Sequence, residues 1–200
     1  METRIAKIIS YIFHPLFMPT LGIFILLNLE TYLKYTIVPS GKIAIYSIVF
    51  INTGIVPAIL AFFQYRFKFI KTLQMESKEE RIFPFLATIF FYFFCFYILK
   101  KNNLPAPVYM LMFGAAVLVS VVFLINFFWK ISVHATGAGG IIGMLWGISQ
   151  KLNLEIMPVI FLFILFGGFI GFARLKLNAH NPSQIYAGFL LGFFSLLLFI

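Results

Sequence analysis

Long apolar runs, each ended by polar or charged residues, follow one another along the whole chain. A helix that crosses a bilayer needs about 20 mainly apolar residues, and this length divides the chain into about seven segments. The runs are continuous, whereas the strands of a membrane barrel alternate apolar and polar residues, so we predict helices. The seven segments are Ile8–Leu29, Ile43–Phe63, Ile82–Leu99, Val108–Trp129, His134–Ile148, Ile156–Ala173 and Pro182–Ile200. The pattern predicts an all-α, polytopic transmembrane bundle, a single domain over residues 1–200, whose fifth segment is the shortest and least apolar.

The composition agrees with lipid as the solvent. Hydrophobic residues make up 62% of the chain and charged residues 10%, against about one quarter charged residues in a soluble domain. The net charge of +9 comes from cations at the ends of apolar runs, where they anchor helices at headgroups, so we expect membrane lipid and no nucleic acid as partner. Cys95 is the single cysteine and lies in an apolar run, which excludes an intrachain disulfide and a cysteine metal cluster.

The cations are distributed unequally between the two ends of the predicted bundle. If all seven segments cross, one face holds ten cations and the other holds five. The ten are Arg4, Lys7, Arg66, Lys68, Lys71, Lys78, Arg81, Lys130, Arg174 and Lys176, and the five are Lys34, Lys42, Lys100, Lys101 and Lys151. The positive-inside rule indicates that the first face is cytoplasmic. No small-residue cleavage site follows residues 1–7, so we expect a retained first helix in an integral protein of the bacterial inner membrane.

Glycines recur four residues apart in the last three segments. They are Gly139, Gly143 and Gly147, then Gly167 and Gly171, then Gly188 and Gly192. This spacing allows helices to approach closely. It is compatible with packing inside the chain and with a face through which the protein forms a homo-oligomer.

Two of the three histidines, His134 and His180, lie on the cation-rich face, together with Arg174. A phosphoryl group in transfer carries charge on its oxygens, which guanidinium groups and helix N-termini hold, while one imidazole attacks and another protonates the leaving oxygen. Asn181 and Gln184 fit a capping box with Pro182 in the first turn, so His180 is predicted just outside a helix N-terminus that favours an anion. These residues point to phosphate chemistry.

The same residues resemble the signatures of the type 2 phosphatidate phosphatase superfamily. Arg174, five residues and His180 match its R-x5-H, and Ser132-Val133-His134 is similar to its P-S-G-H. Its first signature, K-x6-R-P, is only partly present, because Lys78 precedes Arg81 by three residues and Pro84 follows by three. The resemblance covers residues 78–192 in the family's order and is compatible with a six-helix phosphatase-like core.

The resemblance implies a membrane phosphatase that hydrolyses lipid or polyprenyl phosphates or diphosphates without metal or cofactor, through a phosphohistidine. His180 would be the nucleophile and His134 the general acid. The residues implied to hold the phosphate oxygens are Arg174, Arg81, Ser132 and Lys78. Many bacterial members of the family face outward, whereas the cation distribution indicates the cytoplasm, so both orientations stay open.

Gln184 departs from the family pattern, which has an aspartate at that position to orient the nucleophilic imidazole. A Gln carbonyl can accept the same hydrogen bond but supplies no negative charge. The alternative to an enzyme is therefore a non-catalytic relative that binds lipid headgroups or partner helices. His14 lies about two turns inside the first segment, and we interpret it as a residue that satisfies a carbonyl freed by Pro15 rather than as part of the site.

Overall fold

The structure, a computed structural model, describes residues 2–70, 72 and 79–200. These residues form helices and connecting turns and contain no β-strand, which confirms the all-α prediction. Within the same part of the chain, six helical stretches are long and apolar enough to cross a membrane: Glu2–Asn28, Pro39–Arg66, Glu79–Lys101, Ala106–Phe128, Met157–Lys176 and Pro182–Phe199. The predicted fifth segment also folds as a helix, α8 (Val133–Leu152), but it is less apolar and does not belong to this set.

The chain divides into two compact units. Unit 1 comprises Met1–Met18 and Trp129–Ile200, and unit 2 comprises Pro19–Phe128. The expectation of a single domain stays a prediction.

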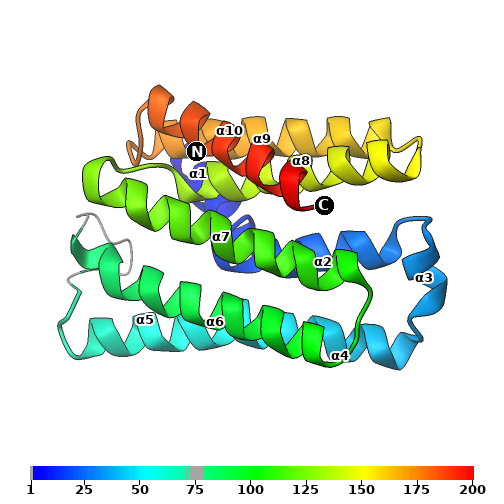
Figure 1. Cartoon of the computed structure of the whole chain (residues 1–200). Coiled ribbons are helices and arrows are strands. Elements are labelled where there is room, and N and C mark those ends of the chain that lie inside the picture. Colours follow the sequence, from blue (N-terminus) through cyan, green and yellow to red (C-terminus); the bar gives the residue numbers. More distant parts are fainter. Residues whose placement is uncertain (1, 71, 73–78) are drawn as a thin grey trace. The chain divides into compact units, whose positions relative to one another are not determined.

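Unit 1 contains α8 together with α1 (Glu2–Ile12), a short 3₁₀ turn (Pro15–Phe17), α9 (Met157–Lys176) and α10 (Pro182–Phe199). Helices α8 and α10 run in the same direction, because they are joined at both ends. The Ser132 N–H donates to the Gln184 carbonyl over 3.2 Å at one end, and Lys151 Nζ donates to the Ile200 carbonyl over 2.6 Å at the other. Figure 1 shows α8, α9 and α10 side by side in the yellow-to-red part of the chain.

The recurring glycines bring α8 and α10 into backbone contact. A Cβ built on Gly139 would lie 2.0 Å from the Phe189 carbonyl oxygen, and one on Gly192 would lie 2.0 Å from the Thr136 carbonyl oxygen. No side chain fits in these spaces, which is the physical reason for glycine at these positions. The spacing on α8 and α10 therefore serves packing inside the chain. Gly168, on α9, differs, since its Cβ would meet nothing within 4 Å.

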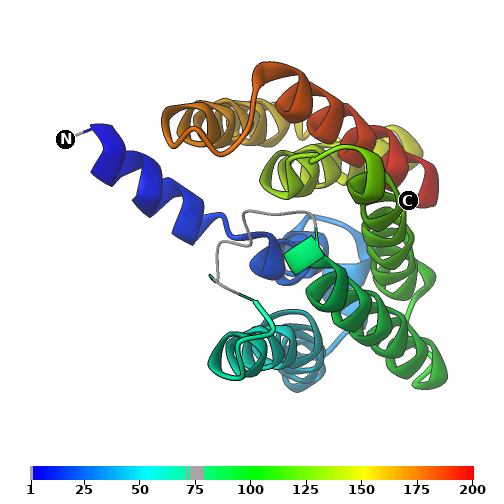
Figure 2. The same cartoon turned by 90° about the vertical axis from the view of Figure 1, so that its left-hand side faces the viewer.

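The first predicted segment, Ile8–Leu29, is not one continuous helix, and this corrects the sequence prediction. Helix α1 ends at Ile12, His14 is extended with φ −66° and ψ 136°, and a second helix, α2 (Met18–Asn28), follows the 3₁₀ turn. Pro15 is the cause, since a proline disfavours the helical conformation of the residue before it. Figure 2 looks nearly along the orange α9 and shows the dark blue α1 lengthwise, so the two helices cross at a steep angle.

Unit 2 carries the remaining helices. They are α2, α3 (Tyr32–Thr36), α4 (Pro39–Phe50), a π-helical turn (Ile51–Ile55), α5 (Val56–Arg66), a 3₁₀ turn (Glu79–Arg81), α6 (Ile82–Lys101) and α7 (Ala106–Phe128). The π-helical turn interrupts the span Pro39–Arg66 just before Pro57, which has no backbone N–H to donate to the regular helical hydrogen-bond pattern. Helices α6 and α7 pack through aromatic pairs such as Phe93 with Phe113, whose ring centroids lie 6.2 Å apart.

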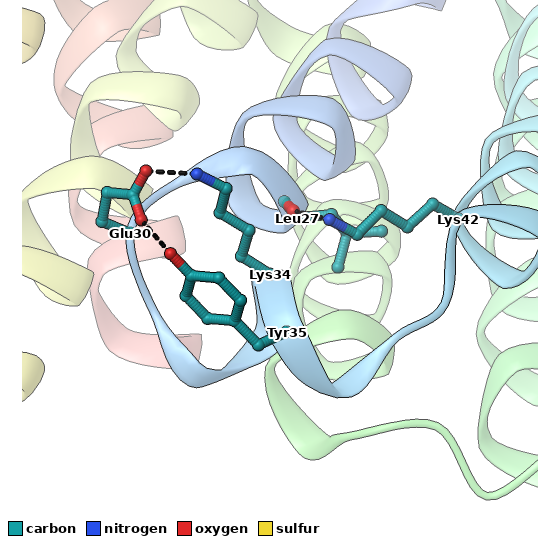
Figure 3. A network of polar contacts seen from close by, with 5 residues as sticks. All are labelled: Leu27, Glu30, Lys34, Tyr35 and Lys42. Carbon is teal, nitrogen blue, oxygen red and sulfur yellow. Dashed lines mark hydrogen bonds and ion pairs between the residues drawn. The ribbon is translucent and has the colours of Figure 1, made fainter.

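Polar contacts tie the connection from α2 to α4 (Figure 3). Lys42 Nζ donates to the Leu27 carbonyl over 2.9 Å and so satisfies a carbonyl in the last turn of α2. Glu30 forms an ion pair with Lys34 and accepts a hydrogen bond from the Tyr35 hydroxyl. The Lys34 ammonium, with Tyr35 as the second donor, lowers the pKa of the exposed Glu30 carboxyl. These groups are already paired with one another, and this connection contains none of the predicted site residues.

Candidate active site

His180 lies in the short connection between α9 and α10 and is 9% exposed. Its Nδ1 is 3.0 Å from Gln184 Oε1. The same oxygen accepts the Asn181 N–H over 3.2 Å, while Asn181 Oδ1 accepts the Gln184 N–H over 3.0 Å, which is the predicted capping box. Because a backbone N–H can only donate, Gln184 must present its oxygen here, and His180 Nδ1 therefore carries the proton. In the neutral ring the unprotonated nitrogen is then Nε2.

The end of α9 brings Arg174 and His180 to the same end of unit 1. Asn178 adopts the left-handed conformation, with φ 50°, directly after the helix. The Ala179 N–H donates to the Arg174 carbonyl over 3.1 Å and the Asn178 N–H to the Leu175 carbonyl over 2.9 Å, which closes the turn as a helix C-cap. The seven residues from Arg174 to His180 thus turn the chain back towards α10.

His134 occupies the first turn of α8. Ser132 is the N-cap of this helix, and its fully buried hydroxyl accepts the Ala135 N–H over 3.5 Å. His134 Nε2 lies 3.2 Å from the carbonyl oxygen of Ser10, on α1. A carbonyl only accepts, so Nε2 is the donor and carries a proton. The sequence predicts Ser132 as a phosphate ligand; its hydroxyl here caps α8.

Arg174 also reaches Ser10. Its Nη1 donates to Ser10 Oγ over 3.4 Å, and its Nε is buried with no hydrogen-bond partner in the part of the chain that the structure describes. Arg174, His14 and His180 all lie close enough to His134 to interact with it electrostatically. Three imidazoles and a guanidinium therefore lie near one another, and Ser10 contacts both His134 and Arg174.

Comparison with known proteins finds one family model that matches the C-terminal part of the chain, where these residues lie. Residues 125–200 match the PAP2 superfamily. The match confirms the resemblance to the type 2 phosphatidate phosphatases. Searches of curated proteins and of solved structures each found no match. With six candidate spans among the residues that the structure describes, this is an integral membrane protein with a phosphatase-like PAP2 segment.

The PAP2 segment contains four of the predicted site residues and the residue that orients one of them: Ser132, His134, Arg174, His180 and Gln184. The other two predicted phosphate ligands lie outside it. Arg81 ends the 3₁₀ turn before α6, in unit 2, and Lys78 is outside the described residues. Their contribution to the site stays a prediction.

Ser10 and His14 lie before the PAP2 segment, and sequence reasoning did not place them at the site. The His14 ring meets the His134 ring edge-on, with centroids 5.6 Å apart. Its Nδ1 accepts the Leu16 N–H over 3.4 Å and so caps the 3₁₀ turn, while the interpretation that His14 satisfies a freed carbonyl stays a prediction. A histidine beside a proline in an apolar run was the available signal for His14, whereas nothing in the sequence around Ser10 distinguishes it from other interfacial serines.

Proposed function

We propose that this protein is a membrane phosphatase that hydrolyses a lipid or polyprenyl phosphate or diphosphate through a phosphohistidine at His180. The observation that carries the proposal is the hydrogen bond from His180 Nδ1 to Gln184 Oε1, which fixes the proton on one nitrogen and leaves Nε2 with the lone pair. The PAP2 match over this segment supports the proposal. Substrate headgroups would meet the site at the end of the bundle.

In the first step Nε2 of His180 attacks phosphorus, and the bond from phosphorus to the leaving oxygen breaks. His134 acts as general acid in its doubly protonated, cationic form: its Nε2 proton goes to that oxygen and leaves a neutral ring, so the lipid leaves as an alcohol or, from a diphosphate, as the monophosphate. Arg174 neutralises charge on the phosphoryl oxygens. Water then attacks the phosphohistidine, His134 takes its proton, and inorganic phosphate and His180 are released.

Gln184 supplies less than a carboxylate would during this cycle. Attack by Nε2 places positive charge on the His180 ring, and a neutral amide stabilises that charge only through its dipole. We therefore expect a slow enzyme. A non-catalytic headgroup-binding protein is the alternative that the same observation favours.

The test uses purified protein in detergent with phosphatidate, phosphatidylglycerol phosphate and polyprenyl diphosphate. Wild type should release phosphate from at least one of them, and His180→Ala should release none above background. A pulse of ³²P-labelled substrate should leave an alkali-stable, acid-labile label on wild type, as a phosphohistidine does. Thermal unfolding of both proteins checks that the variant is folded. If wild type releases no more phosphate than His180→Ala on any substrate, the enzyme proposal fails.

A further inference from the structure

Ser10 binds the two donors that the proposed reaction needs for its substrate. Its carbonyl oxygen is 3.2 Å from His134 Nε2, and its hydroxyl oxygen is 3.4 Å from Arg174 Nη1. Ser10 lies in the last turn of α1, where carbonyls have no partner within the helix and are available to other donors. Two oxygens of one residue thus engage donors that the proposed reaction would offer to phosphate oxygens.

Ser10 and a bound phosphate exclude each other on chemical grounds. The carbonyl and the phosphate oxygens are all acceptors, and His134 Nε2 has one proton to give. The C-terminal end of α1 also carries the negative end of the helix dipole, which repels an anion. A phosphate that binds His134 and Arg174 therefore requires Ser10 to move away.

Helix α1 is held weakly enough for this movement. Ala6 is its one buried residue among those described, and its ion pair, Glu2 with Lys176, is exposed. Such pairs contribute little to stability. The extended backbone at His14 separates α1 from the 3₁₀ turn and offers a place where the chain can bend.

The two outer faces of α1 suit the membrane surface. Ile5, Ile8 and Ile12 form an exposed apolar face, with exposed fractions of 46%, 56% and 64%, and Arg4 and Lys7 are exposed on the next face. An apolar stripe beside a basic one is typical of a helix that lies in the plane of the interface. Lipid can therefore hold α1 after it leaves the site.

We propose that Ser10 is the internal ligand of His134 and Arg174 in the resting protein, and that the phosphate of the substrate displaces it as α1 withdraws. The proposal rests on the proposed function, because it assumes that a phosphate binds these donors. Ser10 is then a positioning residue that sets substrate affinity. Removing its hydroxyl weakens the internal ligand and leaves the chemistry of the bound substrate unchanged.

The test is Ser10→Ala in the full chain, with two readouts. Isothermal titration with inorganic phosphate should give a Kd about two- to tenfold lower than in wild type, the factor that one lost hydrogen bond supplies. KM for the best substrate should fall by the same factor while kcat stays within about twofold. Ser10→Thr, which keeps the hydroxyl, should behave like wild type, and so should Thr3→Ala, which removes an exposed hydroxyl from the same helix.

Unchanged or weaker phosphate binding in Ser10→Ala overturns the proposal, and weaker binding would make Ser10 a direct ligand of phosphate. The Kd comparison needs no turnover, so it separates this proposal from the enzyme proposal. A wild type that hydrolyses nothing but binds phosphate more weakly than Ser10→Ala refutes the phosphatase and supports the internal ligand.

Discussion

Gln184 Oε1 accepts a hydrogen bond from His180 Nδ1 over 3.0 Å, and the same oxygen holds the first turn of α10 through the Asn181 N–H. One side chain therefore orients the candidate nucleophile and caps the helix that supports it. The backbone carbonyl of Gln184 accepts the Ser132 N–H, which links this helix to the start of α8. Gln184 therefore both connects α10 to α8 and contacts the candidate nucleophile.

Gln184→Glu should raise the rate. Glu has the same reach as Gln, so its carboxylate can keep both hydrogen bonds and adds the missing charge next to the His180 ring. Loss of such a charge costs about 10⁴ in kcat in a serine protease, and we expect a gain of at least about tenfold in kcat. Phosphate release under saturating substrate measures it. Gln150→Glu, at the exposed far end of α8, is the control for added charge, and equal rates in all three proteins would favour the non-catalytic alternative.

His134→Ala should slow the enzyme in a way that depends on the leaving group. A general acid contributes about 10²- to 10⁴-fold for a poor leaving group such as a lipid alkoxide. A substrate analogue with a nitrophenol leaving group needs little protonation, so its kcat should fall much less. Both substrates should lose rate equally in His180→Ala, since the nucleophile serves both. The role of His134 is contradicted if its variant also slows the two substrates equally.

Arg174→Lys should lower kcat/KM by about 10- to 100-fold. A lysine keeps the charge but lacks the planar, forked donors with which arginine binds phosphate oxygens. Steady-state kinetics on the best substrate measures the change. Lys101→Ala removes an exposed cation from the end of α6 and should leave kcat/KM within about twofold of wild type. A comparable loss of kcat/KM in both variants would show that Arg174 contributes only to the overall positive charge of the protein and does not bind the substrate phosphate.

Gly192→Ala should destabilise the protein, whereas Gly168→Ala should not. The added methyl at position 192 would lie 2.0 Å from the Thr136 carbonyl oxygen and 2.8 Å from the Gly140 nitrogen, both backbone atoms that cannot turn aside. Overpacking of this kind costs about 1–3 kcal/mol or more. At Gly168 the methyl meets nothing within 4 Å, and alanine favours the helix by up to about 1 kcal/mol. Thermal unfolding in detergent compares them, and equal unfolding temperatures would refute the close α8–α10 contact.

Labelling of introduced cysteines should show which face carries the site. Ser183→Cys places an exposed thiol beside the candidate site, and Lys151→Cys places one at the opposite end of α8, while the native Cys95 is buried. The positive-inside rule predicts that a membrane-impermeant maleimide added to intact cells labels position 151 and spares position 183. The reverse pattern would mean an outward-facing site and would show that the cations at this end serve the substrate.

Much of this protein follows from local pattern. The backbone N–H and C=O groups of a continuous apolar run must be hydrogen-bonded within the run when it lies in lipid, which requires a helix. The fold class could therefore be predicted without any tertiary contact. The capping box at Asn181 could also be predicted, because it depends only on two residues three positions apart in the sequence. The break in the first segment was the exception. Pro15 is a local signal of this break, but the prediction gave more weight to the length of the apolar run Ile8–Leu29.

The sequence by itself determined the helical class and the motif residues His134, Arg174 and His180, because these depend on spacing along the chain. Tertiary structure decided which face the glycines use and that Ser10 and His14 belong beside His134. Those neighbours are separated from His134 by more than a hundred residues, and no local spacing encodes such a contact. Only the packing of α1 across α9 brings an ordinary serine to the two groups that a phosphate would bind.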